Sequence, residues 1–593
     1  MTNQLPTWNL EQYFPGFDSE EFQTAVETVK AQISAQVERT ANFAEGDAAA
    51  NVGDYLEAEK AIIGTIMPLI SYASGHMAVN TRDAAAIKAM STLQMAMIPL
   101  QQAGVRFAAW VGTQDVEAII ASSEIASEHA FMLRNEKINA EHLMSQAEED
   151  LAAELTLSGG SAFGDLQSSV SSQILVTFEK TSGETVTLPI SDVRNLANDP
   201  DRDVRKRAYD AEVAAWKQWE TPLAAALNGV KGEHGTLAEK RGWDSVLASA
   251  LHQNHIDQQT LDAMMSAARD AFPDIHRYWA AKAKTLGIEK LEWCDITAPV
   301  GENNREWQWD EGMDFIKEQF GTFSPKMAEM VQRAQDENWI DAGPREGKVG
   351  GAFCMPIVPG KSGVLSNFTP SFDGVSTMAH ELGHAYHNLC QENTSPLWGV
   401  ATPMTLAETA STFCETILRK AAIRAGSDDE KFAILESGLV DAGQIVVDIT
   451  SRFLFEQSVF ARRKDELLTA EEFCELMIAA QKETYGDAII EESLHPYMWA
   501  VKGHYYSPGY AYYNYPYMFG LLFGLGLYAM YLEDPETFKA NYDDLLASTG
   551  SADAATLAAR FGIDTRSKDF WTASLNVIRQ DIDEFVALVD ARQ

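Results

Sequence analysis

Apolar residues recur at intervals of three and four positions over long stretches of the chain, which is the spacing of one face of an α-helix. The segment between Leu56 and Ala109 shows this pattern clearly. Long runs rich in Ala, Leu, Glu and Lys, with only 20 prolines in 593 residues, agree with a predominantly helical chain. We therefore predict a mainly α fold. Because the chain is far longer than one small core requires, we expect two or more lobes.

Strand patterns are few and form two short pairs. Residues 174–178 and 185–188, separated by a polar turn, predict one β-hairpin. Residues 350–358 and 364–368, joined by Pro359-Gly360-Lys361-Ser362-Gly363, predict a second. Everything else is expected to be helices and their connections.

A polar, turn-forming cluster at Asn198-Asp199-Pro200-Asp201 marks the expected domain boundary. It follows the first hairpin and precedes a charged helix that should begin near Val204. We predict an N-terminal helical lobe with a small hairpin over residues 1–198. Residues 199–593 would form the catalytic domain.

The segment from Gly503 to Leu532 contains no Asp, Glu, Lys or Arg. Its length would allow it to span a bilayer. However, its first half is rich in Tyr and contains Pro508 and Pro516, and its apolar half contains three glycines. We interpret it as a buried loop followed by a core helix, with a membrane-embedded enzyme as the alternative.

Charge and cysteine content narrow the class of protein. The 46 Lys and Arg against 86 Asp and Glu give a formal net charge of −40, which disfavours binding to nucleic acids and to anionic membranes. The five cysteines are odd in number and include no CxxC pair, so a disulfide framework is not expected. The N-terminus lacks the pattern of a secretory signal. These features predict a cytoplasmic protein.

The sequence His380-Glu381-Leu-Gly-His384 carries the candidate chemistry. On a helix, histidines four positions apart project from one face about one turn apart, which suits two ligands of one metal ion. Zinc readily accepts neutral imidazole nitrogens. Glu381 would then lie beside the ion, where its carboxylate can act as general base. The alternative is a helix whose histidines only satisfy hydrogen bonds in the core.

A third metal ligand must come from elsewhere in the chain. An extended HExxHxxGxxH motif is excluded because positions 387 and 390 hold His387 and Cys390. A helix predicted between residues 402 and 426 carries Glu408 and Glu415 on nearly one face. Glu408 would complete a set of two His and one Glu that leaves one position for water. Glu415 is a candidate for orienting a ligand imidazole, and His387 for a structural hydrogen bond.

The block HELGHAYH, with 23 residues between His384 and the Glu of ETAS, resembles the oligoendopeptidase F and thimet oligopeptidase family of zinc metallopeptidases. The segments LAEKRGWDSVL, GGAFCMPI and HYYSPGYAYYNYPYMFG resemble that family as well, and the similarity covers roughly residues 200–590. It implies that His380, His384 and Glu408 bind one Zn²⁺ per chain and that Glu381 is the base. It also implies a two-lobed, multi-helix peptidase with a deep central cleft, and a small β-sheet next to the active-site helix.

The resemblance also assigns candidates outside the metal motif. In that family a His and one or more Tyr stabilise the oxyanion, which requires positioned hydrogen-bond donors. His504 matches the His, and Tyr510 and then Tyr517 are the favoured tyrosines. Tyr513 and Tyr515 are further candidates for substrate contact. An unpaired strand edge at Gly351 and Ala352 would bind an extended peptide through its main chain, the alternative being a purely structural hairpin.

We therefore predict a zinc-dependent oligoendopeptidase that cleaves internal bonds of short peptides by Glu381-assisted attack of a zinc-bound water. A zinc carboxypeptidase on a similar helical scaffold would share HExxH and the downstream Glu, and would release single C-terminal residues instead. A non-catalytic peptide-binding helical protein belongs to a different class. The intact Glu381 beside a complete ligand set argues against it.

Overall fold

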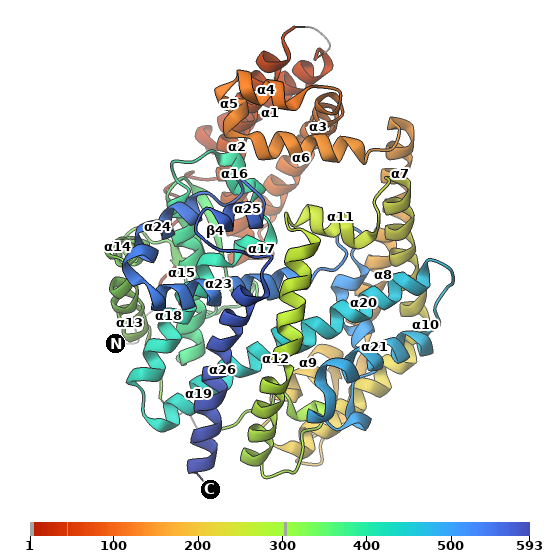
Figure 1. The fold of residues 1–593 in the computed structure, drawn as a ribbon, viewed down its shortest axis with the longest axis vertical. Coiled ribbons are helices and arrows are strands. Elements are labelled where there is room, and N and C mark those ends of the chain that lie inside the picture. Colours follow the sequence, from red (N-terminus) through yellow and green to blue (C-terminus); the bar gives the residue numbers. More distant parts are fainter. Residues whose placement is uncertain (1–4, 44–45, 302–304, 593) are drawn as a thin grey trace. The chain divides into compact units, whose positions relative to one another are not determined.

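The computed structural model describes residues 5–43, 46–301 and 305–592, and helices dominate among them, as the sequence predicts (Figure 1). The chain forms two compact units, each made of three separate stretches. The first unit comprises Met1–Leu143, Arg305–Ala421 and Leu527–Asp564; the second comprises Met144–Asn304, Ala422–Gly526 and Thr565–Gln593. The division into residues 1–198 and 199–593 follows sequence order instead and stays a prediction; Asn198 lies within the second unit.

The first unit contains helices from both ends of its sequence range and a small sheet. Its helices are α1 (Glu20–Ala41), α2 (Ala48–Val79), α3 (Ala84–Gly112), α4 (Val116–Ser122), α5 (Glu124–Glu128), α6 (Ala130–Glu141), α13 (Trp309–Phe323), α14 (Pro325–Asp336), α15 (Phe372–Cys390), α16 (Pro396–Ala401), α17 (Met404–Ala407), α24 (Pro535–Ala547) and α25 (Ala554–Ala559). The continuous periodicity between residues 56 and 109 is divided between α2 and α3. The break is set by Asp83, whose carboxylate accepts hydrogen bonds from the first N–H groups of α3.

The sheet of the first unit confirms the second predicted hairpin and adds a strand. The strands β3 (Ile340–Asp341), β4 (Phe353–Val358) and β5 (Lys361–Leu365) lie in the order β3-β5-β4. β4 and β5 are antiparallel, with Phe353 opposite Leu365. β5 begins at Lys361, three residues earlier than predicted, because the turn needs only Pro359 and Gly360, and Gly360 supplies a φ of +70°. β3 pairs in parallel with β5 and was not predicted from the sequence.

The second unit contains the longest helix and the first predicted hairpin. Its elements are α7 (Gln146–Ser158), α8 (Gly160–Gln173), β1 (Leu175–Glu179), β2 (Thr185–Pro189), α9 (Ile190–Asn195), α10 (Arg202–Lys240), α11 (Val246–Gln253), α12 (Gln258–Thr285), α19 (Asp428–Gly443), α20 (Ile449–Arg463), α21 (Ala470–Tyr485), α22 (Met498–Val501) and α26 (Lys568–Ala591). β1 and β2 are antiparallel, so this hairpin is confirmed. A π-helical turn, Gln444–Asp448, joins α19 to α20. Two further helices, α18 (Thr409–Ala425) and α23 (Tyr515–Glu533), have residues in both units.

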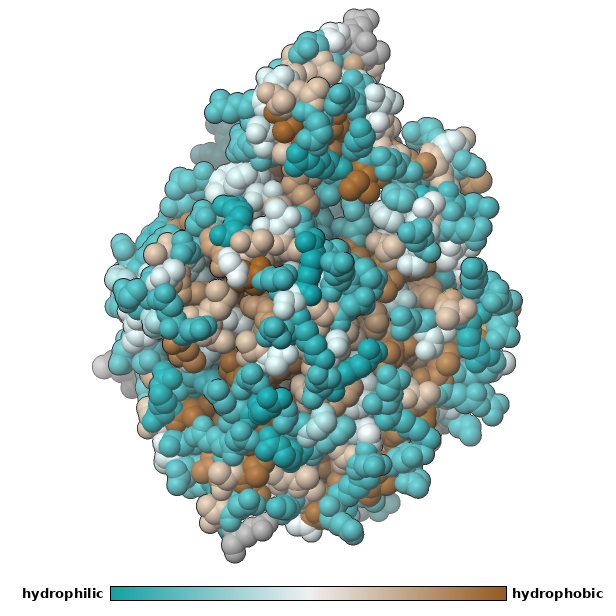
Figure 2. Space-filling view, in the orientation of Figure 1, coloured by the Kyte–Doolittle hydropathy of each residue, from teal (hydrophilic) through white to brown (hydrophobic). Residues whose placement is uncertain are grey.

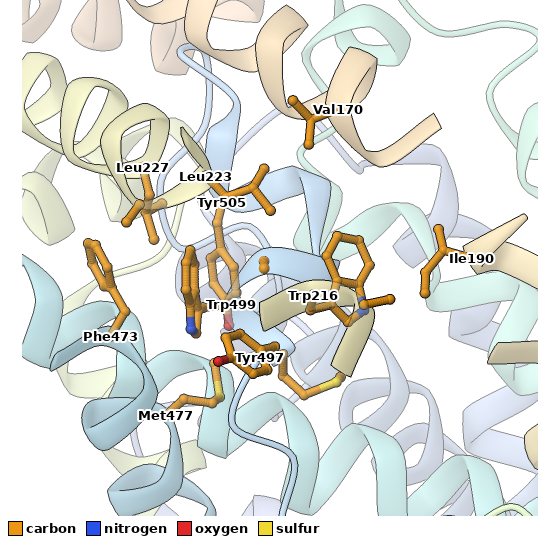
Figure 3. Packing of buried hydrophobic residues seen from close by; sticks show 14 of the residues in the cluster. Val170, Ile190, Trp216, Leu223, Leu227, Phe473, Met477, Tyr497, Trp499 and Tyr505 are labelled. Atoms are coloured by element: carbon orange, nitrogen blue, oxygen red, sulfur yellow. The ribbon is translucent and has the colours of Figure 1, made fainter. Parts of the chain in front are cut away.

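Large aromatic side chains fill the core of the second unit (Figure 3). Trp499 and Trp216 are almost completely buried there, and the Trp499 ring lies 5.2 Å from that of Phe473 on α21. These side chains place α21 and α22 in one core with α10. The packing therefore fixes the segment that leads from α22 into residues 503–514.

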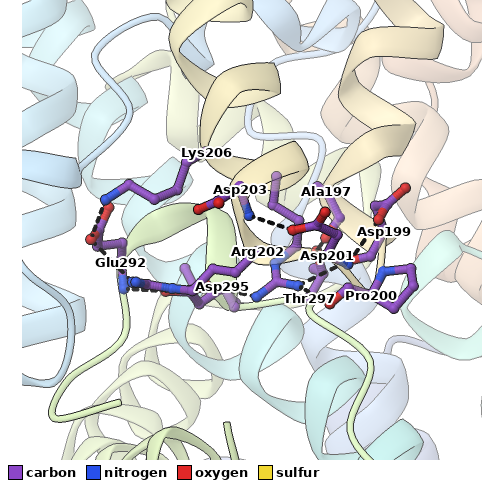
Figure 4. Close-up of polar contacts among 12 residues, drawn as sticks. Ala197, Asp199, Pro200, Asp201, Arg202, Asp203, Lys206, Glu292, Asp295 and Thr297 are labelled. Carbon is purple, nitrogen blue, oxygen red and sulfur yellow. Dashed lines mark hydrogen bonds and ion pairs between the residues drawn. The ribbon is translucent and has the colours of Figure 1, made fainter. Parts of the chain in front are cut away.

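The start of α10 is held by a network of charged side chains (Figure 4). Asp201 caps the helix, which begins at Arg202 and so two residues before the predicted start. Arg202 donates hydrogen bonds to Asp295 and Glu292, and Lys206 Nζ lies 2.8 Å from Glu292 Oε1. The network anchors the helix next to the 3₁₀ turn Trp293–Asp295.

Two helices of the described chain, α2 and α23, are long and apolar enough to cross a membrane. In α23, 67% of the most apolar 18-residue stretch is buried, and in α2 the corresponding share is 44%. Core helices of globular proteins have the same length and composition, and α23 coincides with the core helix predicted before residue 532. Hydrophilic residues cover most of the face shown in Figure 2, where a large part of the 86 acidic residues can remain in contact with water.

Candidate metal centre

α15 presents His380 and His384 on one face, as the four-residue spacing predicts. The helix begins after Ser371, whose hydroxyl accepts a hydrogen bond from the N–H of Gly374. The two imidazole ring centres lie 5.0 Å apart and their planes are nearly perpendicular, at 80°. The side chains are 28% and 22% exposed, so both remain accessible to an ion from solvent.

Glu408 lies at a break between two helices. The sequence predicts one continuous helix between residues 402 and 426, and this is wrong: Pro403 caps the short α17, and Glu408 follows it before α18 begins. The hydroxyl of Ser411 donates both to the Glu408 carbonyl and to its carboxylate Oε2, at 3.1 and 2.9 Å. Ser411 belongs to the ETAS segment. These bonds hold the carboxylate in one direction.

The three predicted ligands converge. Glu408 Oε2 lies 3.1 Å from His380 Nε2 and 3.4 Å from His384 Nε2, and the three ligand atoms are all within 4.8 Å of one another. Burial would lower the pKa of His380, yet its hydrogen bonds to Glu408 and Glu415 raise it to about 10. Burial likewise would raise the pKa of Glu408, but both imidazoles hold it well below its usual range. The group therefore favours a positive charge at its centre.

Glu415 fixes the orientation of the His380 ring. Its carboxylate lies 3.2 Å from His380 Nδ1, and it also accepts hydrogen bonds from Ser376 and Arg419. Burial opposes its ionisation, but the charge of Arg419 and the bond to His380 lower its pKa to about 2. A carboxylate can only accept, so Nδ1 carries a proton toward Glu415, and Nε2, on the side of Glu408, is the nitrogen that can release its proton and bind a metal ion. Ser376 and Arg419 were not predicted from the sequence, although Arg419 follows Glu415 by one helical turn.

Gly383 allows α15 to approach the start of α18 closely. A Cβ atom at this position would lie 2.6 Å from Ser411 Cα and 2.9 Å from the Ala410 carbonyl oxygen. Both are backbone contacts that cannot yield without moving the helix. The glycine within the motif is therefore what brings Glu408 within reach of both histidines.

Gly383→Ala is expected to separate the two helices and to weaken metal binding. Overpacking of this kind costs about 1–3 kcal/mol of stability, and it displaces Glu408 from the imidazoles. Gly64→Ala on α2 is the matched control, because a Cβ atom at Gly64 meets nothing within 4 Å. Thermal unfolding and metal content should change in Gly383→Ala only. Equal behaviour of the two variants would contradict this account of the glycine.

Glu381 lies on the side of α15 that faces the sheet. It is 6% exposed, and burial raises the pKa of its carboxyl. Burial, and next the charge of Glu381, raise the pKa of the Cys354 thiol on β4. Asn388, two turns along α15, donates to Ser362 on β5 at 3.0 Å. The small sheet therefore packs next to the HExxH helix, as expected.

β4 is the outer strand of the described sheet, so a strand edge lies next to the residues for which peptide binding is predicted. Gly351 and Ala352 precede the strand, and Gly351 has a φ of +78° with its carbonyl held by Asn367 at 3.0 Å. Pro356 has no N–H, and its carbonyl accepts from Ser71. The part of the edge suited to pairing with a peptide is thus the beginning of β4. Binding of a peptide there stays a prediction.

His387 points away from the two candidate ligands. Its Nε2 lies 2.7 Å from the hydroxyl of Thr549, and the side chain is 5% exposed. Burial lowers its pKa to about 4, so it is neutral at pH 7. It does not belong to the group of three ligand atoms. Its surroundings agree with the structural hydrogen bond expected for it.

The tyrosine-rich block lies in the second unit and forms a cluster around His504. The His504 ring stacks on Tyr513 at 5.5 Å, and the Tyr513 and Tyr517 hydroxyls lie 2.8 Å apart. Tyr510 is 53% exposed and contacts the Tyr513 ring edge-on. Tyr515 is buried and donates its hydroxyl to the Ala250 carbonyl, so it packs on the opposite side. The structure brings four of the five predicted residues together.

The backbone conformation of Tyr512 affects which tyrosine side chains of the block lie next to His504. Its φ of +54° is unusual for a bulky residue, and its N–H donates to Glu456, which pairs with the buried Lys231. The left-handed turn changes the alternation of side chains along residues 510–515. This arrangement places Tyr513, rather than Tyr512, against His504.

Comparisons with known proteins identify the family of this chain. Residues 195–577 match peptidase family M3, and residues 111–174 match the Oligopeptidase F family. The chain is 28% identical to an oligoendopeptidase F homolog of Lactococcus lactis over 76% of this chain and 75% of that one. It is 27% identical to the group B oligopeptidase PepB of Streptococcus agalactiae over the same shares.

Solved structures show the same fold. A crystal structure from Chlamydophila abortus has a TM-score of 0.84, 20% identity and 98% coverage of both chains. Oligoendopeptidase-F from Enterococcus faecium has a TM-score of 0.70, 18% identity and coverage of 96% of this chain and 99% of that one. Since the M3 match extends over well more than half of the sequence, this chain belongs to peptidase family M3 and is a peptidase.

Proposed function

We propose that this peptidase is a zinc-dependent oligoendopeptidase that hydrolyses internal bonds of short peptides. The observation that carries the proposal is the convergence of His380, His384 and Glu408 beside Glu381 on the same helix. The curated relatives named oligoendopeptidase F and oligopeptidase support peptides as substrates.

The donor set fits one zinc ion per chain. Two imidazole nitrogens and one carboxylate oxygen form the three-ligand set of catalytic zinc sites and leave a coordination position open. Glu415 fixes the His380 tautomer so that Nε2 is available, which is the usual arrangement around a metal-binding histidine. Bound zinc would supply a Lewis acid that lowers the pKa of water and polarises the scissile carbonyl.

The chain's own residues would carry out the proton transfers and the stabilisation of charge. Glu381 accepts a proton from the attacking water and delivers it to the leaving amine. Its buried carboxyl makes it a stronger base than an exposed glutamate. His504 with Tyr510 or Tyr517 donates hydrogen bonds to the oxyanion. Tyr513 would support these donors through its contacts with His504 and Tyr517.

Substrate would pair through its main chain with the beginning of β4, near Gly351 and Ala352. Such pairing depends little on side chains, which suits an enzyme that degrades varied short peptides. We further propose a cytoplasmic location, because all five cysteines are free in the structure.

Cleavage mapping on a mixed library of short peptides, with and without a chelator, tests this function. We expect cuts at internal bonds, also in peptides whose two ends are blocked, and loss of activity when zinc is removed. Release of single C-terminal residues from free-ended peptides only would favour the carboxypeptidase alternative. Binding without cleavage by zinc-loaded protein would favour a non-catalytic peptide-binding protein. If the protein could be extracted from cells only with detergent, the membrane-embedded alternative would be favoured.

A further inference from the structure

A chain of buried polar side chains in the second unit ends at His504. Asn514 is 6% exposed and lies between two groups: its Oδ1 is 3.0 Å from Arg452 Nη1, and its Nδ2 is 2.6 Å from His504 Nε2. The mechanism proposed above makes no use of Asn514. Because it touches the ring that would donate to the oxyanion, its orientation decides which ring nitrogen carries a proton.

The orientation of the Arg452 side chain is fixed by a second buried residue, Asp448. It lies on α20, is 8% exposed, and donates its second Nη group to the carboxylate of Asp448. Asp448 ends the π-helical turn and also accepts from the Tyr485 hydroxyl at 3.1 Å. π-helical turns are rare and occur frequently at functional sites. Here the turn delivers a carboxylate that holds Arg452 in place.

The chemistry of Arg452 settles the orientation of the Asn514 amide. A guanidinium has five N–H donors and no acceptor, so only the Asn514 oxygen can face it. The amide NH₂ must then face His504, and an NH₂ group can only donate to a lone pair. Protonation of His504 Nε2 would set two donors 2.6 Å apart. His504 Nε2 is therefore the acceptor.

We propose that Asn514, held by Arg452, is a positioning residue that keeps His504 as the neutral tautomer with its proton on Nδ1. The inference rests on the proposed function in one respect, which is the role of His504 as oxyanion donor. It deepens that role by naming Nδ1–H as the only ring group able to donate to substrate.

The surrounding charges favour the same neutral state. Burial lowers the pKa of His504 to about 3, and the positive charges of Arg452, Lys231 and Lys502 act in the same direction, while Asp448 opposes them. The Tyr513 ring covers one side of the imidazole, and Tyr505 contacts it at 4.5 Å. His504 is thus a neutral hydrogen-bond donor at pH 7 and contributes no positive charge to the site.

Nitrogen NMR on the full-length protein with ¹⁵N-labelled histidine tests the tautomer directly. Comparison with His504→Gln identifies the His504 signals. We expect wild-type His504 to show a protonated Nδ1 and an unprotonated Nε2. In Asn514→Asp the new carboxylate accepts from the ring, so Nε2 should become protonated. A wild-type spectrum with a protonated Nε2, or unchanged signals in Asn514→Asp, would overturn the proposal. The wild-type spectrum decides even if the variant does not fold.

Kinetics provide a second measurement that a merely structural role would not move. In Asn514→Asp the pKa of His504 should rise toward its ordinary value, because the added carboxylate stabilises the cation. Above that pKa the variant carries no proton on Nδ1, and kcat should fall on the order of 10²-fold, as for loss of one oxyanion donor. Below it Nδ1–H returns and kcat should recover. A pH-independent change in kcat would count against the proposal.

Failure of the inference and failure of the proposed function give different results. If His504→Gln kept full activity, the oxyanion role of His504 would be wrong, whereas the NMR spectrum would still report which nitrogen Asn514 selects. If His504→Gln lost activity but Nε2 were protonated, the proposed function would stand and the positioning role of Asn514 would fall.

Discussion

Glu381→Gln is expected to retain zinc and to lose almost all peptide hydrolysis. The amide has nearly the shape of the carboxylate but cannot accept the proton of the attacking water. Loss of a general base typically costs about 10²–10⁴ in rate. Zinc content measured by mass spectrometry should match the wild type, because His380, His384 and Glu408 are unchanged. Values of kcat/KM on a short internally cleaved peptide should show the loss.

Glu392→Gln is the matched control for this experiment. Glu392 follows α15 by two residues and is exposed, so its charge lies near the same helix but outside the metal centre. It should leave both zinc content and kcat/KM close to wild-type values. Full activity of Glu381→Gln would exclude Glu381 as the base. An equal loss in both variants would point to a general effect of charge instead.

Glu408→Ala is expected to abolish stable zinc binding. It removes the carboxylate oxygen that both ligand imidazoles face, and it leaves only two protein ligands. Removal of outer partners alone already costs about 10–100-fold in metal affinity, so loss of a direct ligand should exceed that range. Zinc dissociation constants, measured by competition with a chelator, check the expectation. Activity should disappear together with the metal.

Glu415→Gln separates the direct ligand from the residue that orients it. Gln can still accept from His380 Nδ1, so zinc affinity should decrease within about 10–100-fold rather than vanish. Complete loss of zinc in Glu415→Gln, together with wild-type zinc affinity in Glu408→Ala, would instead identify Glu415 as the metal ligand. We expect Glu408 to be the ligand because, of these two glutamates, only Glu408 lies within reach of both Nε2 atoms.

Local signals in the sequence were sufficient for much of the site. The spacing of His380 and His384 fixes their separation as soon as a helix forms, and turn residues mark both hairpins. The direction of Glu408 was not predictable in this way. It depends on the helix break, on the Ser411 hydroxyl and on the close approach at Gly383, and all three involve contacts between segments distant in sequence.

Long-range pairing limited the prediction of the fold as well. β3 is only two residues long, which is too short for a periodic pattern. Its Ile340 pairs with Val364, far along the chain, so the strand could not be predicted from the sequence. In the tyrosine block, spacing alone could not distinguish Tyr513, stacked on His504, from Tyr515, bound to Ala250. Tyr512 between them has a left-handed conformation, and its N–H donates to the Glu456 carboxylate on α20, a contact that spacing does not predict.

The interleaving of the two units has a consequence for synthesis of the chain. The first unit ends at Asp564, whereas the second needs α26, whose Trp571 is buried against Phe519. During translation the first unit can therefore complete its core while the second still lacks its last helix. Since domains acquire native packing only when all their contacting segments are available, the second unit should close only after α26 has left the ribosome. If His504 acts as proposed, hydrolysis would begin only at that point.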